Sequence, residues 1–286
     1  GEYDAIIPYE ETGESSDGKI QVRKPARYGQ NIRPAGADAE KGRLLFPAGH
    51  CLNAADVGAL LTCGIMEIRV WSLHISLIPT GDELVARSAV PGPGQVRESN
   101  TAMISSLLEQ AGISPSCHDI IPDDPEKLRE AIITSLGSSD MVIISAGSSA
   151  GTRDYTRKVI EELGTILFHG VAIRPGKSIL CGDIQGKAVI GLPGHPAASL
   201  TAFQEVVVDL LRHWGFHPPR DPVCTALVAE PISSDGGIDE YIPVSIYRLE
   251  GEMFVLPRPR GQAGQIQGIR SNGILHIPAR KEGYAQ

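Results

Sequence analysis

The chain has 286 residues, of which 42% are hydrophobic, and its 34 acidic and 26 basic side chains give a formal net charge of −8. The apolar share is large enough to form packed cores, which excludes general disorder, and the acidic balance argues against a protein that coats nucleic acid. No stretch approaches the roughly 18 apolar residues of a membrane helix. Five widely spaced cysteines without a Cys-x-x-Cys pair predict a reduced, cytoplasmic chain with buried free thiols.

The first part of the chain, residues 1–70, is predicted to be β-rich. A strand is expected over 3–9, and a strand followed by a turn over 42–49. Asn53 is expected to cap a short helix over 54–62. This part shows no catalytic constellation.

Residues 71–216 are predicted to form an α/β domain, because short apolar strands alternate with helices of ten or more residues. The expected strands are 73–79, 116–121, 141–145, 166–168, 178–181 and 188–192, and the expected helices are 100–111, 125–136, 154–163 and 197–214. This alternation predicts a mostly parallel sheet with helices on both faces, which makes three layers. Ligands bind beyond the carboxyl ends of such strands, so the loops after Pro79, Ser145 and Leu192 are the expected site.

Residues 217–286 are predicted to form a small, separate β module. A His-Pro-Pro sequence at 217–219 ends the α/β pattern, and the short alternating stretches that follow are split by glycine and proline.

The loop after the first α/β strand carries two adjacent carboxylates. Thr80 and Gly81 are followed by Asp82 and Glu83. Oxygen ligands of this kind suit Mg²⁺, which usually takes one or two carboxylates together with substrate oxygens. The alternative is a plain turn whose aspartate caps a helix, and spacing alone leaves both open.

A second loop, residues 145–155, is rich in glycine and serine and lies between a buried strand and a helix. Backbone N–H groups at such a helix start can hold a phosphate or another oxyanion. Asp154 either caps the helix or binds a metal. The loop lacks the Gly-Lys-Ser/Thr ending of an ordinary ATPase, and a simple connector is the alternative.

Two further turns bring positive or titratable side chains to the same region. Arg174 and Lys177 flank a Pro-Gly turn, which is either an anion site or the solvated tip of a hairpin. The turn 191–196 leads into the last helix. Its His195 either hydrogen-bonds or exchanges a proton with a ligand, or is a structural residue.

In their order along the chain, these stretches resemble the molybdopterin molybdenumtransferase family of molybdenum cofactor biosynthesis, which includes the E domain of gephyrin. Arg174 stands where the family has lysine, His195 where it has asparagine, and 146–149 (AGSS) where it has GGVS. The matching stretches are 4–8 (DAV), 32–38 (IR-x-x-G-x-D), 45–49 (L-x-PAG), 80–84 (TGDEL), 98–100 (DSN), 122–124 (x-DD), 174–177 (KPGK), 192–196 (LPGNP) and 264–278.

The resemblance implies a fold and a reaction. The α/β domain would be of the molybdopterin-binding type, flanked by a β-rich N-terminal segment and a small C-terminal β-barrel. The protein would be an enzyme that inserts molybdate into adenylylated molybdopterin and releases AMP, with Mg²⁺ as cofactor. A homodimer is expected, and the resemblance implies that further family residues precede Gly1.

The resemblance also implies roles for individual residues. Catalytic roles fall on Glu83, Asp123 and Asp154, and metal binding on Asp82, Glu83 and Asp154. The residues implied to bind substrate are Thr80, Ser99, Asn100, Gly147, Ser148, Ser149, Gly151, Arg174, Lys177, Pro193, Gly194, His195 and Ser199.

Other functions stay open at this point. An adenylyltransferase acting on molybdopterin has a related single-domain fold, but the β segments at both ends of this chain argue against it. A molybdopterin-binding carrier, sensor or scaffold without turnover is a further alternative. The departures at 146–149 and His195 also leave open a paralogue specific for tungstate.

Overall fold

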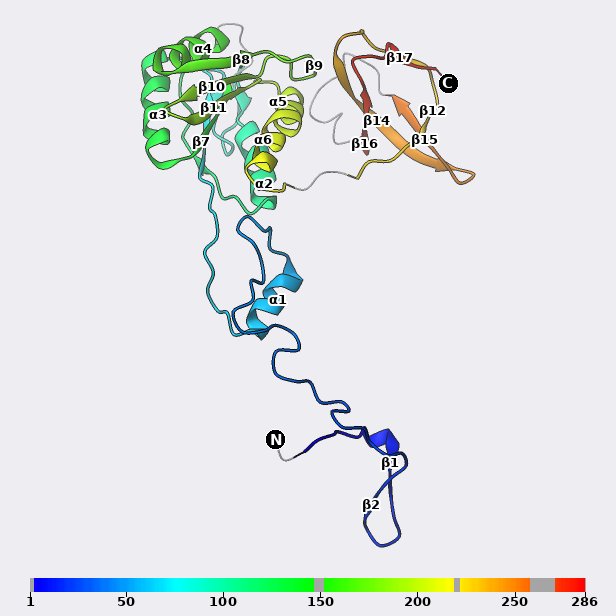
Figure 1. Cartoon of the computed structure of the whole chain (residues 1–286). Helices are drawn as coiled ribbons and strands as arrows, with labels where there is room; N and C mark the ends of the chain where they lie inside the picture. The colour runs from blue at the N-terminus through cyan, green and yellow to red at the C-terminus, as the bar shows by residue number, and fades with distance from the viewer. Residues whose placement is uncertain (1–2, 147–151, 219–221, 258–270, 286) are drawn as a thin grey trace. The chain divides into compact units, whose positions relative to one another are not determined.

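The computed structural model describes residues 3–146, 152–218, 222–257 and 271–285, and the side chains of 146 and 152–154 lie outside that description. By its internal contacts the chain divides into two compact units, Gly1–Arg69 and Val70–Gln286. Figure 1 traces the elements of each unit in chain order. Each helix within the described residues is too short or too polar to cross a membrane.

The N-terminal unit contains little regular structure. A 3₁₀ turn, η1 (Tyr9–Glu11), precedes an antiparallel pair of short strands, β1 (Thr12–Glu14) and β2 (Ile20–Val22). The β-rich character predicted for this part is therefore limited, in the described residues, to six residues in two strands.

Both strands predicted for this unit are wrong, because neither segment is a strand among its described residues. Within 3–9, Pro8 has no N–H to donate to a ladder and leads directly into η1. The Ile6 amide donates instead to the Gln30 carbonyl, at 2.9 Å. The stretch 42–49 consists of turns, a bend and irregular backbone.

The helix α1 (Ala54–Thr62) begins at Asn53, as predicted. The Asn53 side chain accepts hydrogen bonds from the amides of Ala55 and Asp56, and the Asp56 carboxylate accepts one from the Asn53 amide at 3.0 Å. This reciprocal arrangement is a capping box. Leu60, 8% exposed, is the one buried side chain among the described residues of the N-terminal unit.

The second unit is built on a six-stranded sheet with the order β6-β3-β7-β11-β10-β8. Its strands are β3 (Ile75–Thr80), β6 (Ser116–Cys117), β7 (Met141–Ala146), β8 (Thr165–His169), β10 (Leu180–Ile184) and β11 (Lys187–Leu192). The strands β6, β3, β7 and β11 are parallel, which confirms the prediction, whereas β10 and β8 are antiparallel. Only Gln185 and Gly186, both at positive φ, join β10 to β11, so this connection can only be a hairpin.

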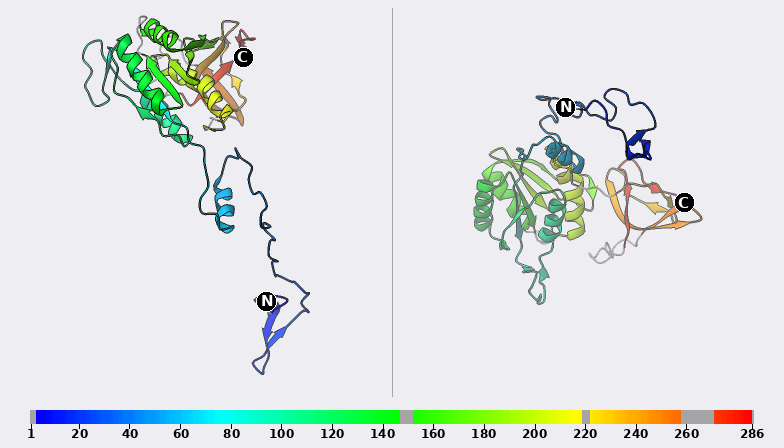
Figure 2. Two further views of the ribbon diagram at one scale, coloured as in Figure 1. Left: turned by 60° about the vertical axis from the view of Figure 1, so that its left-hand side comes forward. Right: turned by 90° about the horizontal axis from the view of Figure 1, so that it is seen from below.

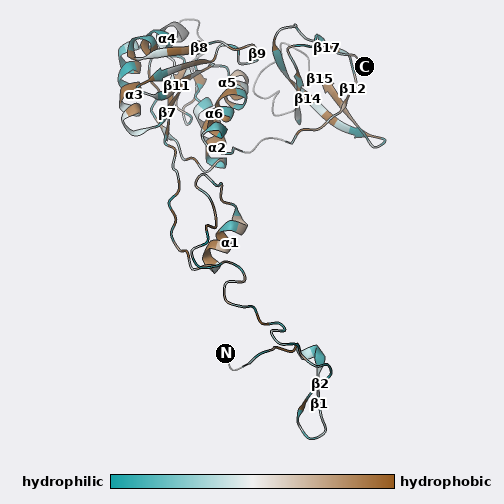
Figure 3. Ribbon diagram, in the orientation of Figure 1, coloured by the Kyte–Doolittle hydropathy of each residue, from teal (hydrophilic) through white to brown (hydrophobic). Residues whose placement is uncertain are grey.

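Helices cover both faces of this sheet, and the predicted three layers are confirmed (Figures 1 and 2). Met141 and Ile143 of β7 join the core with α2, α5 and α6, while Val142 and Ile144 join the core with α3 and α4. Figure 3 shows these hydrophobic strands between the helix layers. The helices are α2 (Asn100–Gln110), α3 (Pro125–Ser138), α4 (Thr152–Leu163), α5 (Pro196–Ala202) and α6 (Val208–His213).

Two of the predicted elements are interrupted. The helix expected over 197–214 contains a π-helical turn, η2 (Phe203–Val207), between α5 and α6. The strand expected over 116–121 is reduced to β6 and an isolated bridge between Ile121 and Thr80. Apolar periodicity cannot reveal a π turn, because an apolar face continues through it.

The C-terminal part of this unit is all β in the described residues. Its strands form a sheet with the order β12-β15-β14-β16 and a separate pair, β13–β17, and the short strand β9 of the α/β part pairs with β14. The barrel stays a prediction, as does the boundary at 217. The strands are β9 (Ile173–Arg174), β12 (Leu227–Val228), β13 (Ile232–Ser233), β14 (Asp239–Leu249), β15 (Glu252–Pro257), β16 (Gly273–Ile277) and β17 (Gly283–Tyr284).

All five cysteines are free, but the prediction that they are buried holds only for Cys181. Burial raises the pKa of the Cys181 thiol. The other four lie in loops, at a helix end or on an edge strand, where side chains reach solvent. The exposed cysteines are Cys51, Cys63, Cys117 and Cys224.

Candidate functional site

The predicted site loops follow three adjacent parallel strands, β3, β7 and β11. Ser145 of β7 is paired with Pro79 of β3 on one side and with Leu192 of β11 on the other. The strands therefore end level with one another, and the chain leaves all three at one edge of the sheet. This carboxyl edge is where the sequence placed the site.

Two acidic residues from different loops lie next to each other at this edge. The Gly81 amide donates to the Ile121 carbonyl at 3.1 Å, and the Asp123 amide donates to Asp82 Oδ1 at 3.1 Å. Burial raises the pKa of Asp123; a backbone hydrogen bond at Asp82 opposes this effect, while the charges of Asp82 and Glu83 add to it. Asp82 and Asp123 form what we call the acid pair.

The acid pair has the donor chemistry of a magnesium site. Asp123 Oδ1 is buried and has no hydrogen-bond partner among the described residues, so a cation would satisfy it. The described side chains include no group of three or more metal-ligating residues. Two carboxylates are nevertheless enough for Mg²⁺, which usually completes its shell with water and substrate oxygens.

Asn100, the first residue of α2, connects two of the site loops. Its Nδ2 donates to Ser145 Oγ at 3.0 Å and to the Gly194 carbonyl at 2.8 Å. The side chain is buried, yet its Oδ1 has no partner among the described residues. The predicted substrate residues Asn100 and Gly194 thus lie together. Asn100 Oδ1 is an acceptor beside them that has no partner among the described residues.

Glu98 fixes the start of α2, a role that the sequence analysis missed. Its carboxylate accepts hydrogen bonds from the Thr101 amide and hydroxyl, both at 2.7 Å, and from Arg87 Nε at 3.1 Å. Ser99, which directly precedes the helix, makes no side-chain capping bond. The signal lies in the three-residue spacing from Glu98 to Thr101, which lets a carboxylate reach an unpaired helix N–H.

A groove of about 620 Å³ contains Lys177 and His195, two of the predicted substrate residues. Two residues of its lining, His169 and Ser178, were not predicted. His169 is the last residue of β8 and lies opposite Leu180 in the sheet, so only the topology reveals that it faces this turn. The lining consists of His169, Gly170, Gly176, Lys177, Ser178, Pro193, His195 and Ala198.

The backbone of the turn around Gly176 is tightly constrained. Gly176 is buried at a φ of 112°, and a Cβ there would lie 3.2 Å from the Ala198 carbonyl oxygen and 3.3 Å from the Ala202 amide nitrogen. Glycine is therefore required where this turn meets α5. The adjacent Lys177 has no ion-pair partner among the described residues, and its carbonyl accepts a hydrogen bond from the Val171 amide at 2.9 Å.

Arg174, the other cation of this turn, is already paired. Its Nη2 lies 2.5 Å from Asp235 Oδ2 and its Nη1 lies 3.5 Å from Glu240 Oε1. The hydrogen bond to Asp235, followed by the charges of Asp235 and Glu240, raises the pKa of Arg174. Both carboxylates belong to the C-terminal β part.

The structure describes only some of the remaining predicted residues. Thr80 and Ser199 are buried, and Ser199 Oγ has no hydrogen-bond partner among the described residues. The side chain of Asp154 lies outside the described residues. The loop residues Gly147, Ser148, Ser149 and Gly151 also lie outside them.

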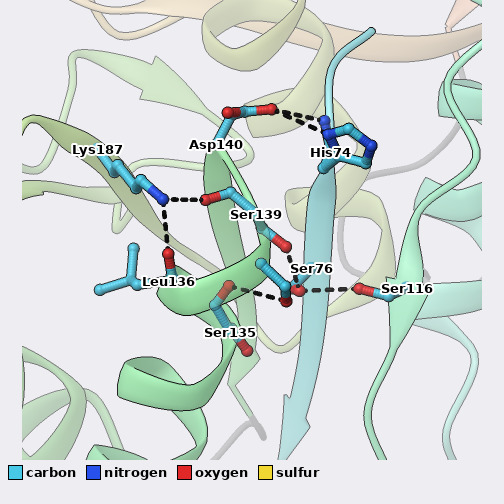
Figure 4. Close-up of polar contacts among 9 residues, drawn as sticks. His74, Ser76, Ser116, Ser135, Leu136, Ser139, Asp140 and Lys187 are labelled. Atoms are coloured by element: carbon cyan, nitrogen blue, oxygen red, sulfur yellow. Dashed lines mark hydrogen bonds and ion pairs between the residues drawn. The ribbon is translucent and has the colours of Figure 1, made fainter.

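A polar cluster lies at the opposite, amino-terminal edge of the same sheet (Figure 4). Ser76 Oγ is 2.7 Å from Ser139 Oγ and 2.8 Å from Ser116 Oγ. Lys187 Nζ donates to the carbonyls of Leu136 and Ser139, at 2.6 and 2.9 Å. These contacts satisfy the end of α3 and join it to β3 and β11, so the cluster is structural.

Known proteins and families match this chain over nearly its whole length. Residues 76–213 match a family described as a probable molybdopterin binding domain, and 1–64 match the MoeA N-terminal region (domain I and II). A Methanocaldococcus jannaschii protein named for molybdopterin biosynthesis is 31% identical over 277 residues, or 94% of this chain and 67% of its own length. The molybdopterin molybdenumtransferase of Haemophilus influenzae is 32% identical over 209 residues, or 73% of this chain.

A solved structure agrees with these matches. The crystal structure of a molybdopterin biosynthesis MoeA protein from Pyrococcus horikoshii has a TM-score of 0.76 and 32% identity, and covers 98% of this chain. This chain spans 70% of that protein, and 52% of the Haemophilus relative. On these similarities, the chain belongs to the molybdopterin molybdenumtransferase (MoeA) family.

Proposed function

We propose that this chain acts in molybdenum cofactor biosynthesis by inserting molybdate into adenylylated molybdopterin, with release of AMP. The observation that carries this proposal is the placement of two unlike groups at one sheet edge. The acid pair follows β3, and the groove with Lys177 and His195 adjoins the end of β11. One strand separates β3 from β11, so their axes lie about 10 Å apart, which suits a small substrate with several anionic groups.

The groove is the proposed oxyanion subsite. Molybdate is a dianion, and Lys177 supplies a cation whose charge no described carboxylate neutralises within ion-pair distance. His195 and His169, which both line the groove, supply ring N–H donors, and Ser178 supplies a hydroxyl. Arg174, the other cation of this turn, stays a prediction as a ligand of the oxyanion.

The acid pair is the proposed centre for cleavage of the adenylyl phosphoanhydride. In this step water adds to phosphorus, the bridging P–O bond breaks, and the water loses a proton. Asp123 is the proposed acceptor of that proton, through the carboxyl oxygen that does not hold the metal. The Asp82 carboxylate accepts a hydrogen bond from the Asp123 backbone N–H, which holds the two loops together.

Mg²⁺ is the proposed metal, held by Asp82 and the unpartnered Asp123 Oδ1. When bound, it would supply charge neutralisation for phosphate oxygens. Glu83 and Asp154 stay predictions for the same metal.

The test is AMP release from adenylylated molybdopterin on addition of molybdate. Lys177→Gln should lower the molybdate-dependent rate at least tenfold, and Asp123→Asn should lower it by about 10²–10⁴. Lys127→Gln, on the exposed face of α3, is the control and should leave it unchanged. Tight pterin binding without AMP release would instead favour a carrier. Faster AMP release with tungstate than with molybdate would favour a tungstate-specific paralogue.

We also propose that the active protein is a homodimer. The N-terminal unit buries only Leu60 among its described residues, and apolar surface of this extent is commonly covered by a partner. Sedimentation should show that the wild type is a dimer. Leu61→Asp, on the exposed face of α1, should dissociate it. The control Val90→Asp should keep the dimer, and a monomeric wild type would contradict the proposal. In the described residues of the N-terminal unit, the large apolar side chains that are more than half exposed are Tyr3, Ile6, Tyr9, Ile20, Tyr28, Leu44, Leu61 and Met66.

The proposed location is the cytoplasm. Five free cysteines, four of them exposed, support a reducing compartment, because exposed thiols oxidise readily elsewhere.

A further inference from the structure

The short strand β9 is the place where the α/β part and the C-terminal β part of the second unit are joined by a ladder. Ile173 and Arg174 pair in parallel with Asp239 and Glu240 of β14, and the Asp239 amide donates to the Ala172 carbonyl at 2.8 Å. We call this the β9–β14 junction. A two-residue ladder contributes little by itself, so side-chain contacts decide whether it holds.

Arg174 supplies the charged contacts of the β9–β14 junction. Its guanidinium reaches Asp235 with one terminal nitrogen and Glu240 with the other, at 2.5 and 3.5 Å. A guanidinium can serve two carboxylates at once because its donors form a planar fork, whereas the lysine usual in the resembling family is a single point charge. The arginine thus matches the acidic side chains opposite it.

Glu240 makes this pairing important for the fold. Its side chain is only about 5% exposed, and burying a carboxylate is costly unless it is hydrogen-bonded and faces a cation. The Ser234 hydroxyl donates to its Oε2 at 2.6 Å, and Arg174 lies beside its Oε1. Removing the guanidinium would leave the buried Glu240 without this cation.

A second contact strengthens the same junction. The Tyr241 hydroxyl donates to Glu205 Oε2 at 2.8 Å, and Glu205 lies in the π turn η2. The Tyr241 ring also stacks on that of His276 at 4.8 Å between centroids. β14 is therefore held to the α/β part at two places, at β9 and at η2, the turn that follows α5.

The position of Lys177 depends on the same segment. Only Pro175 and Gly176 separate it from Arg174, and Gly176 is in close contact with α5. The Lys177 carbonyl is bound by the Val171 amide, on the other side of β9. Anything that releases β9 from β14 frees one side of the turn that presents Lys177 to the groove.

We propose that Arg174 is a positioning residue: it locks β14 onto β9 and thereby holds Lys177 in the groove, instead of binding the oxyanion itself. Both terminal nitrogens of Arg174 already face carboxylates within 3.5 Å, so an oxyanion would have to displace one of these contacts to bind there. The junction rests on the fold alone, whereas the effect on Lys177 rests on the proposed function.

Amide hydrogen exchange on the full chain tests the junction. Arg174→Gln should speed exchange about tenfold in peptides covering 170–176 and 236–244, and leave the β7 peptide 141–145 unchanged. Asp235→Asn, which removes only the more exposed partner, should act in the same direction, and Arg174→Lys should be intermediate. Arg248→Gln, an exposed arginine farther along β14, is the matched control.

Molybdate binding by equilibrium dialysis tests the link to Lys177. Arg174→Gln should raise the molybdate Kd about fivefold, Arg174→Lys should restore part of the affinity, and Arg174→Gln should add nothing in a Lys177→Gln background. Additive losses with unchanged exchange would make Arg174 a direct ligand and overturn the proposal. If the wild type binds no molybdate, the link to Lys177 falls with the proposed function, and exchange alone decides the junction.

Discussion

Asn100 donates a hydrogen bond from Nδ2 to the Gly194 carbonyl at 2.8 Å, which ties the first turn of α2 to the turn before α5. The same nitrogen donates to Ser145 Oγ at the end of β7. One buried amide on α2 thus contacts two other segments, which lie 45 and 94 residues further along the chain.

Asn100→Ala should lower the free energy of unfolding by about 1–3 kcal/mol, because it leaves the partly buried Gly194 carbonyl and the buried Ser145 hydroxyl without this donor. Urea unfolding measures the change. Gln110→Ala, at the exposed end of the same helix, is the control and should change stability little. A loss no larger than that of the control would show that the amide contributes nothing to holding the loops.

The acid pair predicts a pH-dependent stability. Burial raises the pKa of Asp123, so the folded chain binds this proton more tightly than the unfolded chain. Ionisation of Asp123 therefore costs stability as the pH rises above the ordinary carboxyl value of about 4 and through the raised value. Asp123→Asn should raise the Tm relative to wild type at pH 7.5, and this gain should shrink as the pH approaches 4.

The control for this titration is Asp119→Asn, an exposed carboxylate a few residues earlier in the chain. The effect of Asp119→Asn on the Tm should not change with pH in the way expected for Asp123→Asn. Added Mg²⁺ should raise the Tm of the wild type at pH 7.5 and leave that of Asp123→Asn unchanged. A gain from Asp123→Asn that is equal at all pH values would contradict the assigned cause.

The local elements were predictable where short-range chemistry determines them. Asn53 caps α1 as expected, and Asp124 caps α3, with Pro125 as the first helical residue. The continuous apolar stretch at 141–145 gave the central strand β7, because a strand buried on both faces has no polar alternation.

The contacts that build the site were not predictable in the same way. Arg174 meets Asp235, 61 residues away, because β9 pairs with a strand of the C-terminal part. His169 faces the groove because β8 lies antiparallel at the end of the sheet. The motifs identified which loops matter, but strand order decides which side chains meet, and no local pattern encodes it.

Lys187 lies at the sheet edge opposite the candidate site, so its loss should affect stability without affecting binding. Lys187→Met removes the donor to the Leu136 and Ser139 carbonyls and a positive charge at the end of α3. The free energy of unfolding should fall by about 1–3 kcal/mol while the molybdate Kd stays unchanged. Lys158→Met, on the exposed face of α4, is the control; an altered Kd would show that the two edges are coupled.

Gly176 offers the sharpest test of how closely the turn and α5 must approach. Gly176→Ala combines two costs: a φ of 112°, which side chains rarely adopt, and a Cβ 3.0 Å from Ile173 Cδ1 and 3.2 Å from the Ala198 carbonyl oxygen. Gly186→Ala is the matched control, because Gly186 also has positive φ, 79°, but nothing within 4 Å of its Cβ. Gly176→Ala should therefore destabilise the chain by about 1–3 kcal/mol more than Gly186→Ala in urea unfolding. It should also weaken molybdate binding, because the displaced turn carries Lys177, whereas Gly186→Ala should not. Equal destabilisation by the two variants would mean that backbone conformation alone explains the glycine, and that the turn can move away from α5 at little cost.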